Sequence, residues 1–356
     1  MKLKKFVSLF TASIVALSLA ACADGGSKTE ETAVSSKGPA DRSETLVIYS
    51  NSVSNGRGEW LTAKAKEEGF NIEMVDIAGA ELADRVIAEK NNGIADMVFG
   101  IGAVDSNKLR DEELLTKFEP EWKDKIEASL ADKDGYYNPV IVQPLVLIGR
   151  KDVKEMPKDW TELGTKYAGK YSINGLQGGT PRAILASILV RYLDEKGELG
   201  VSEEGWKVAK EYIQNAYVLQ KGESSVVKML DDNDPVVYGM MWGSGVLVNQ
   251  KEFNTEFQVM SPKVGVPFVT EQTAILASSK RKALAKEFIN WFGSSEIQVA
   301  YAKEFGSIPA NSDAVKELPE DTQKLLDSVH QQDIDWEVVG QYLDQWVEKT
   351  ELEFVK

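Results

Sequence analysis

Cysteine and histidine are almost absent from this sequence. Its 356 residues include one cysteine, Cys22, and one histidine, His330. A disulfide bond needs two cysteines, so none forms within the chain. Zinc sites combine several cysteine and histidine ligands, and Ser-His-Asp or Cys-His hydrolases need a histidine base. His330 lies in a polar stretch far along the chain and is expected at the surface. We therefore predict no catalytic residue, no metal site and no cofactor.

Positive charge is also scarce. The chain has 41 lysines and arginines against 56 aspartates and glutamates, a formal net charge of -15. Affinity for nucleic acid depends on Lys and Arg that neutralise phosphates, so we expect no nucleic-acid partner. Anionic lipid headgroups would also repel such a chain. Any membrane association is therefore expected to come from an attached lipid alone.

Long apolar runs are missing except at the N-terminus. There Lys2, Lys4 and Lys5 precede residues 6–21, which carry no charge. This run is shorter than the about 20 residues that a membrane-spanning helix needs. A basic N-terminal region, a short apolar stretch and small residues before a cleavage site are typical of a secretory signal peptide. We predict that residues 1–21 are a signal peptide.

The residues around Cys22 resemble the bacterial lipobox, in which the thiol is acylated and becomes the new N-terminus. Here the sequence is Leu19-Ala20-Ala21-Cys22. Residues 22–43 are rich in Gly, Ser, Thr, Lys and Glu and nearly free of large apolar side chains, which predicts a disordered tether. We expect an exported protein that a lipid on Cys22 anchors to the outer face of the bacterial cytoplasmic membrane.

The remainder has the composition of a large folded unit. The chain is 43% hydrophobic, and its length favours two domains or one two-lobed unit. Apolar runs at 45–50 and 71–75 predict strands, with a helix at 56–68 between them. Strand, helix and strand in so short a segment predict a βαβ unit and a parallel sheet.

The same alternation continues along the chain. We expect a helix at 81–91, a strand at 96–99 and a long strand at 140–148 that runs between lobes. A second α/β region is predicted over 159–260, with helices at 181–195 and 203–220 and strands near 171 and 235–241. A further strand is expected at 273–277, followed by mostly helical chain.

The loop after the first strand is the first candidate site. It contains the hydroxyls of Ser50, Ser52 and Ser54, followed by glycines and Arg57 just before a helix. Ligands of open parallel sheets gather at such loops, and a helix N-terminus favours an anion. The guanidinium group of arginine commonly binds a phosphate or carboxylate through two parallel N–H hydrogen bonds. The alternative is an ordinary polar loop that caps the helix.

The second lobe offers a similar segment at 178–182. Thr180 resembles an N-cap and Pro181 a first helical residue, while Gly179 leaves backbone donors uncovered. Capping does not explain Arg182, because the helix dipole disfavours a cation at this end unless an anion offsets it.

Two other glycine-rich turns hold candidates. Trp242 follows a predicted strand and would stack on a ligand to which Ser244 donates; the alternative is an ordinary core aromatic. Gly100 and Gly102 are too few for a dinucleotide fingerprint, and Gly102 is kept as a candidate ligand contact.

Several short motifs, taken in order and spacing, resemble the extracellular solute-binding proteins of ABC importers. The subclass is the one that holds ferric-ion, thiamine, phosphosugar and aminophosphonate binders. The likeness covers residues 45–311, through Leu46–Ser50, Ala95–Gly100, Ser261–Phe268, Ala285–Gln298 and Gly306–Asn311. It implies an α/β, two-lobed periplasmic-binding-protein fold of type II, in which mostly parallel sheets flanked by helices are joined by crossing strands. It also implies a monomer that is not an enzyme and that delivers a small-molecule solute to an ABC permease and its ATPase.

Lobe boundaries are assigned on the same resemblance. We expect lobe 1 at 44–144 plus 263–305, and lobe 2 at 145–262 plus 306–356.

The resemblance leaves the solute open. Ferric binders of this family hold iron with adjacent tyrosines late in the second lobe, where this chain has Tyr238 alone; its pair, Tyr136 and Tyr137, lies earlier. Two hydroxyl- and glycine-rich loops, each with an arginine, suit a phosphate, phosphonate or carboxylate better.

A ferric ion is one alternative. Another is thiamine or a polyamine, with Trp242 stacking and Glu271 or Asp105 pairing with the charge. An extracellular glycosidase would need two placed carboxylates, and no pair stands out.

Overall fold

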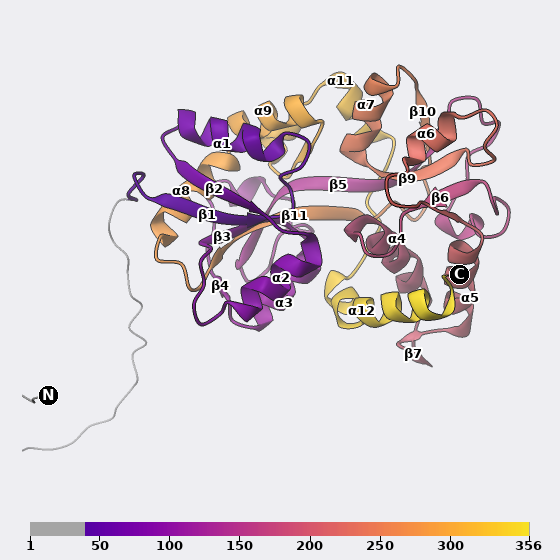
Figure 1. Ribbon diagram of the computed structural model, residues 1–356, viewed down its shortest axis with the longest axis horizontal. Coiled ribbons are helices and arrows are strands. Elements are labelled where there is room, and N and C mark those ends of the chain that lie inside the picture. The colour runs from indigo at the N-terminus through magenta and orange to yellow at the C-terminus, as the bar shows by residue number, and fades with distance from the viewer. Residues whose placement is uncertain (1–39, 356) are drawn as a thin grey trace, which may run out of the picture. The chain divides into compact units, whose positions relative to one another are not determined.

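The computed structural model describes residues 40–355 (Figure 1). The predicted signal peptide, Cys22 and most of the predicted tether lie outside these residues. Eleven strands form a continuous sheet, with the main order β2-β1-β3-β11-β5-β9-β6-β8. We call the part around β1, β2, β3, β4 and β11 lobe 1, and the part around β6, β8, β9 and β10 lobe 2.

Lobe 1 is a mostly parallel sheet between two helical layers. The parallel strands are β1 (Thr45–Ser50), β2 (Asn71–Asp76) and β3 (Met97–Ile101), with β11 (Phe268–Leu276) antiparallel to β3 and β4 (Leu115–Thr116) beside β11. The covering helices are α1 (Arg57–Glu67), α2 (Gly79–Ala88), α3 (Ala103–Asp111), α8 (Lys282–Phe292) and α9 (Ser295–Phe305), with a 3-10 turn η1 (Lys123–Lys125).

The alternation of side chains along β1 builds both layers of lobe 1. Leu46 and Ile48 point to one face and pack with Leu61 of α1 and with α8 and α9. Tyr49 points to the other face and packs with Leu82 of α2 and with α3. Successive residues of a strand face opposite sides, so one short apolar run supplies both cores. Figure 1 shows α1 and α9 on one side of the sheet and α2 and α3 on the other.

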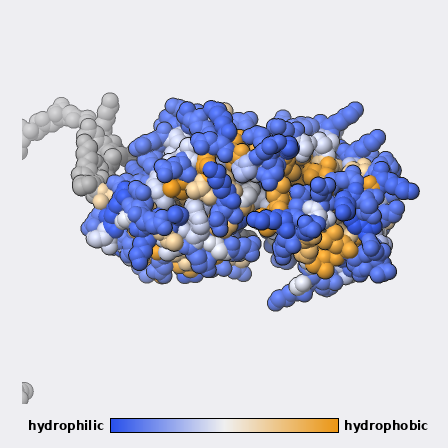
Figure 2. Space-filling model, turned by 90° about the horizontal axis from the view of Figure 1, so that it is seen from above, coloured by the Kyte–Doolittle hydropathy of each residue, from blue (hydrophilic) through white to orange (hydrophobic). Residues whose placement is uncertain are grey.

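Lobe 2 follows the same plan. Its strands are β6 (Tyr171–Ile173), β8 (Tyr217–Val218), β9 (Tyr238–Trp242) and β10 (Phe257–Val259). Its helices are α4 (Gly179–Leu189), α5 (Glu203–Gln214), α6 (Ser225–Leu230), α7 (Gly243–Glu252), α11 (Glu320–Asp327) and α12 (Trp336–Glu353), with 3-10 turns η2 (Trp160–Glu162) and η3 (Val190–Tyr192). Figure 2 shows hydrophilic side chains over most of one face, with apolar side chains gathered in patches.

One strand, β5 (Tyr137–Arg150), joins the lobes. Its first half pairs with β11 as far as Pro144, and from Leu145 onward it pairs with β9 and β10. Within lobe 2, Leu145 and Leu147 pack with α4, α5 and α12, whereas Val146 and Ile148 pack with α6, α7 and α11. The strand predicted to run between lobes is present, and both of its faces are buried.

The last part of the chain returns to lobe 1 before it enters lobe 2. The strand β12 (Ile308–Pro309) pairs with Ile141 and Val142 of β5, and α10 (Ser312–Val315) follows it. The Asn311 amide donates to the Gly293 carbonyl at the end of α8. Leu325 of α11 then joins the core of lobe 2. This pairing favours a crossing after α10 rather than at residue 306.

Two predicted helices are shorter than expected. The helix expected at 181–195 ends at Leu189 and is followed by η3 and by the strand β7 (Leu193–Glu198). After β7 the chain folds back on itself, and only a glycine at 197 permits this close approach, because a Cβ there would lie 2.1 Å from the Val201 carbonyl oxygen. The helix expected at 203–220 ends at Gln214, before β8. His330 lies beyond the end of α11 and is exposed, as predicted.

Candidate functional site

The carboxyl ends of the parallel strands of both lobes point toward the crossing strands. In lobe 1, Ile101 at the end of β3 pairs with Gln272, in the middle of β11. In lobe 2, Trp242 at the end of β9 pairs with Leu145, where β5 enters that lobe. The loops that lead into α1, α2, α3, α4 and α7 therefore lie at edges that face each other. Such edges are where open α/β sheets bind ligands.

The helices at these edges begin without side-chain caps. The N-cap residues Gly56, Ala78, Gly102, Gly178 and Trp242 make no side-chain capping hydrogen bond, whereas Ser202, Ser224 and Asp335 cap α5, α6 and α12. The three lobe 1 helices have an acidic residue in the first turn, and α4 and α7 have none. The partial positive charge at the start of α4 is therefore balanced by neither a cap nor an acid, and among the described residues α7 has only the Gln143 side chain of β5 as an acceptor for one of its N–H groups.

The first predicted loop is held by its own hydroxyls. The Ser52 backbone N–H donates to the Ser50 hydroxyl at 3.0 Å, and both side chains are buried. Ser54 is exposed. Gly100 makes room for the loop, because a Cβ there would lie 2.3 Å from the Ser52 hydroxyl oxygen. At α1, the Arg57 N–H already donates to the Ser54 carbonyl.

Arg57 and Ser52 converge on Glu271 of β11. The Ser52 hydroxyl donates to the Glu271 carboxylate at 2.7 Å, and a guanidinium nitrogen of Arg57 lies 3.9 Å from it. The Glu271 side chain is 14% exposed. Burial raises the pKa of this carboxyl, while Arg57, Ser52 and Gln143 oppose the rise. Glu271, proposed from the sequence as a partner for a cationic ligand, thus has an internal cation.

Gln143 links this group to lobe 2. It contributes to the stabilisation of the Glu271 carboxylate, and its side-chain oxygen accepts the backbone N–H of Ser244 at 3.3 Å. Ser244 lies in the first turn of α7 and is 1% exposed. Among the described residues its hydroxyl has no hydrogen-bond partner. A buried polar group without a partner is costly, so the Ser244 hydroxyl is a candidate hydrogen-bonding group for a solute.

The second predicted segment begins α4, with a different register from the one expected. Gly178 is the N-cap, so Thr180 and Pro181 lie inside the helix rather than at its cap and first position. Gly179 is exposed and Thr180 half-buried. In the part of the chain that the structure describes, their backbone N–H groups have no acceptor. The first turn of α4 therefore presents free donors.

Arg182 also has an internal partner. Its guanidinium forms an ion pair with Asp344 of α12, whose side chain is 87% exposed. Asp105, in the first turn of α3, lies in the field of this pair. Loss of water raises the pKa of Asp105 to about 6, against the opposing effects of Arg182 and Lys108. Sequence reasoning missed Asp344, and no local pattern in α12 marks it.

Trp242 is not a core aromatic, since its side chain is 39% exposed at the end of β9. Two of the three tyrosines considered for iron are engaged elsewhere. The Tyr137 hydroxyl donates to the Asn107 side chain, and the Tyr238 hydroxyl donates to the Glu155 carbonyl at the opposite end of β9. Among residues 40–355, no group of three or more His, Cys, Asp or Glu side chains is placed so that it could hold a metal ion.

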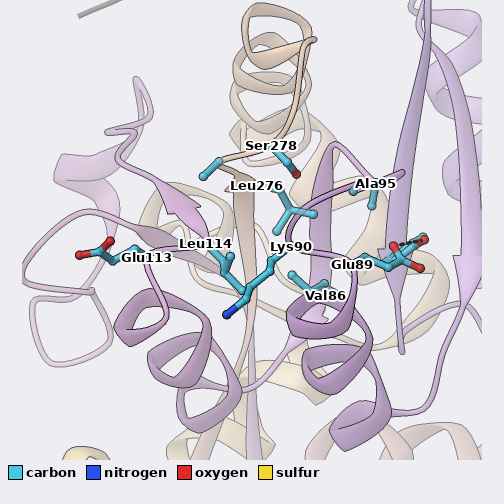
Figure 3. Close-up of a pocket in the computed structure, with 11 residues that line it drawn as sticks. Val86, Glu89, Lys90, Ala95, Glu113, Leu114, Leu276 and Ser278 are labelled. Atoms are coloured by element: carbon cyan, nitrogen blue, oxygen red, sulfur yellow. Dashed lines mark hydrogen bonds between the residues drawn. The ribbon is translucent and has the colours of Figure 1, made fainter.

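One cavity lies away from these loops, and a second is lined in part by residues 174–177 of the loop that leads into α4. The first, of about 180 Å³, lies in lobe 1 beside the start of β3, where it is lined by Val86, Lys90, Leu114 and Leu276 among others (Figure 3). The second, of about 190 Å³, lies in lobe 2 beside Leu176 and Val355 and is mostly apolar. In the described residues no helix is both long and apolar enough to cross a bilayer.

Residues 59–326 match the model of the family described as bacterial extracellular solute-binding proteins. The chain belongs to this family, whose members bind solutes outside the cytoplasm. A probable ABC transporter periplasmic-binding protein, y4fP, from Sinorhizobium fredii is 33% identical over 315 residues, which are 87% of this chain and 86% of that protein.

Solved structures confirm the predicted fold class. Apo ferric ion-binding protein A from Pasteurella haemolytica has a TM-score of 0.75 at 18% identity, covering 88% of this chain and 98% of its own. Iron-bound HitA from Pseudomonas aeruginosa has a TM-score of 0.73 at 17% identity, covering 86% and 98%. AfuA from Actinobacillus pleuropneumoniae, with fructose-6-phosphate bound, has a TM-score of 0.68 at 18% identity, covering 87% and 98%.

Proposed function

We propose that this chain is the substrate-binding lipoprotein of an ABC importer, and that it captures a small solute with an anionic group between its lobes. The group would be a phosphate, phosphonate or carboxylate. The first turn of α4 carries this proposal: it has free N–H groups at Gly179 and Thr180, no cap, no acid, and Arg182 beside them. Helix N-termini of this kind attract anions.

Both sides of the site contribute to the proposed solute contacts. From lobe 2 these are the α4 turn, the Trp242 ring and the buried Ser244 hydroxyl. From lobe 1 they are the loop that begins at Ser50 and the turn at Gly102, the N-cap of α3. The full proposed set is Ser50, Ser52, Ser54, Arg57, Gly102, Gly179, Thr180, Arg182, Trp242, Ser244 and Glu271.

Arg57 and Arg182 already face carboxylates, which limits their role. A guanidinium has five N–H donors, so each arginine keeps donors after pairing with one carboxylate. The backbone N–H of Arg57, in the first turn of α1, already donates to a carbonyl. We therefore assign the Arg57 side chain chiefly to holding Glu271 and Ser52 in place. Arg182, on an open helix turn, is the arginine that we assign to the anion.

Delivery follows from closure of the lobes about β5 and β11. Contacts from both lobes are available together only when the lobes are closed, so the solute shifts the population toward that state. The permease and its ATPase then receive a closed, loaded protein. We keep residues 145–262 in lobe 2. We propose that the last part of the chain enters this lobe after α10, because β12 pairs with the lobe 1 half of β5.

Export and anchoring are proposed from the sequence. The chain would lose residues 1–21, carry a lipid on Cys22, and work as a monomer on the outer face of the cytoplasmic membrane. Palmitate labelling of cells that express the chain, with Cys22→Ser as the comparison, tests this point. Equal labelling of both would remove the lipid from the proposal.

The solute is tested by calorimetry with a panel of phosphate, methylphosphonate, sugar phosphates and carboxylates. We expect binding by at least one of these anions and its loss in Arg182→Ala. Arg191→Ala is the control, because Arg191 also pairs with a carboxylate of lobe 2, Asp159, but away from the α4 turn. Affinity that is unchanged in Arg182→Ala would remove the anion from the proposal.

A cationic solute is the second candidate, favoured by the exposed Trp242 ring and by the carboxyl groups of Asp105 and Asp344 around Arg182. Thiamine and spermidine in the same panel decide this, because cations stack on tryptophan. A ferric ion, bound by several structural neighbours, would show a tyrosine-to-iron absorbance band on addition of ferric salt.

A further inference from the structure

We propose that Asp344 of α12 is an internal counter-ion that occupies Arg182 in the empty protein and is displaced by the anionic group of the solute. Asp344 would thereby set the affinity for the solute and favour its release. The inference rests on the proposed function, because it assigns the anion to the first turn of α4. It adds a residue that touches Arg182 rather than the solute.

The position of α12 supports this role. Glu337, Gly340 and Asp344 are three and four residues apart, so they lie on one face of the helix. Glu337 lies 4.0 Å from Arg110 at the end of α3, and Gly340 lies against Val104 of α3. Asp344 of the same face pairs with Arg182 of α4. One helix of lobe 2 thus contacts both the α3 and the α4 sides of the site.

The Arg182–Asp344 pair is asymmetric in exposure. The Arg182 side chain is 20% exposed and fixed at the start of a buried helix, whereas the Asp344 side chain is 87% exposed. An exposed carboxylate gains little from an ion pair, because water competes for both charges. Asp344 can therefore turn away into water at small cost, and Arg182 keeps its place beside the free N–H groups of Gly179 and Thr180.

Asp105 makes the exchange necessary. It lies on the α3 side of Arg182, where Lys108, Asp344 and Asp84 also contribute charge. Lys108 already pairs with Asp84, so an incoming anion that joined Asp105 and Asp344 would bring a third negative group to the Arg182 guanidinium. Like charges in contact repel, so the anion can bind well only when Asp344 leaves. Asp105, in the first turn of α3, has less freedom to do so.

Calorimetry on the whole chain tests the inference, with inorganic phosphate, methylphosphonate and glucose-6-phosphate as probes. Asp344→Asn removes the charge and keeps the shape. We expect it to bind the best of these probes roughly fivefold more tightly than the parent chain, as for the loss of an exposed ion pair. The gain should shrink at high salt, because exposed charges are screened.

Glu348→Gln is the matched control. Glu348 is exposed one turn further along α12 and carries the same charge, so its replacement changes net charge equally. It should leave the affinity unchanged. Adding Asp344→Asn to Arg182→Ala should also bring no gain, since no guanidinium remains to be released.

The outcomes separate the two levels of the proposal. If Arg182→Ala loses binding while Asp344→Asn matches Glu348→Gln, the anion site stands and the counter-ion inference is wrong. If no probe binds the parent chain or Asp344→Asn, the anionic solute is wrong and the inference fails with it. A thermal melt that matches the parent shows that each variant is folded.

Discussion

The Ser52 hydroxyl donates a 2.7 Å hydrogen bond to the Glu271 carboxylate, which lies 219 positions further along the chain. The bond joins the first loop of lobe 1 to β11, one of the two strands that run toward lobe 2. Arg57 lies beside the same carboxylate at 3.9 Å, and Gln143 connects it to the start of α7. A solute that takes the Ser52 hydroxyl as a donor therefore acts on residues at the junction of the lobes.

Removal of Arg57 should destabilise the protein through Glu271. Arg57→Ala leaves the buried carboxylate without its cation, and we expect a loss of about 1–3 kcal/mol in the free energy of unfolding. The loss should be larger at pH 8 than at pH 5, because protonation of Glu271 removes the unpaired charge. Urea unfolding at the two pH values measures this.

Glu271→Gln separates this explanation from lost packing. Burial raises the pKa of Glu271, so a neutral amide suits its site, and Arg57→Ala combined with Glu271→Gln should regain most of the stability. Lys64→Ala, on an exposed part of α1, is the control and should change little. A double variant as unstable as Arg57→Ala would contradict the ion-pair explanation.

The raised pKa of Asp105 predicts that its contribution to stability falls as the pH rises, whereas the contribution of an ordinary salt-bridged acid grows. The pKa of Asp105 rises from 3.8 to about 6 on folding. The stability that protonation gives is full below pH 3.8 and is lost as the pH rises through about 6. Asp105→Asn should therefore be more stable than the parent at pH 7.5, by at most about 3 kcal/mol.

Urea unfolding between pH 4 and pH 8 tests the Asp105 prediction. The parent should lose stability across this range relative to Asp105→Asn, whereas Asp124→Asn, an exposed acid of lobe 1, should follow the parent. Parallel curves for the parent and Asp105→Asn would show that this carboxyl is ionised normally in the folded protein.

Local patterns predicted the elements of the fold well, because they depend on nearby residues. The run at 45–50 predicted β1 through its apolar side chains, and the helix expected at 56–68 is α1. The partners of the arginines could not be predicted in this way. Arg182 and Asp344 are 162 positions apart, and packing of α12 across both lobes brings them together. Thr180 matched a capping pattern, yet the N-cap of α4 is Gly178, two residues earlier.

Trp242 should contribute more to binding than to stability. Its ring is 39% exposed at the end of β9, so Trp242→Ala should lower the melting temperature less than the loss of a fully buried tryptophan would and should weaken solute binding roughly tenfold, as for loss of a stacked ring. Trp242→Phe should keep part of the affinity. Val248→Ala, an exposed position further along α7, is the control. Retained affinity in Trp242→Ala, measured by calorimetry, would place the solute away from this ring.

Ser244 offers the clearest separation of binding from folding. Its hydroxyl is buried and lacks a partner in the described structure, so Ser244→Ala removes a desolvated group and should raise the free energy of unfolding by up to about 1 kcal/mol. If the hydroxyl awaits the solute, the same change should weaken binding about tenfold.

Ser187 provides the contrast to Ser244. Its equally buried hydroxyl donates to the Ile184 carbonyl at 2.8 Å inside α4, so Ser187→Ala should lower stability and leave affinity unchanged. Calorimetry and urea unfolding on both variants give four values: the two changes in stability should have opposite signs, and only Ser244→Ala should change the affinity. The reverse pattern, in which Ser244→Ala loses stability and keeps its affinity, would mean that the Ser244 hydroxyl serves the packing of α7 against β5. The anion would then depend on the first turn of α4 alone.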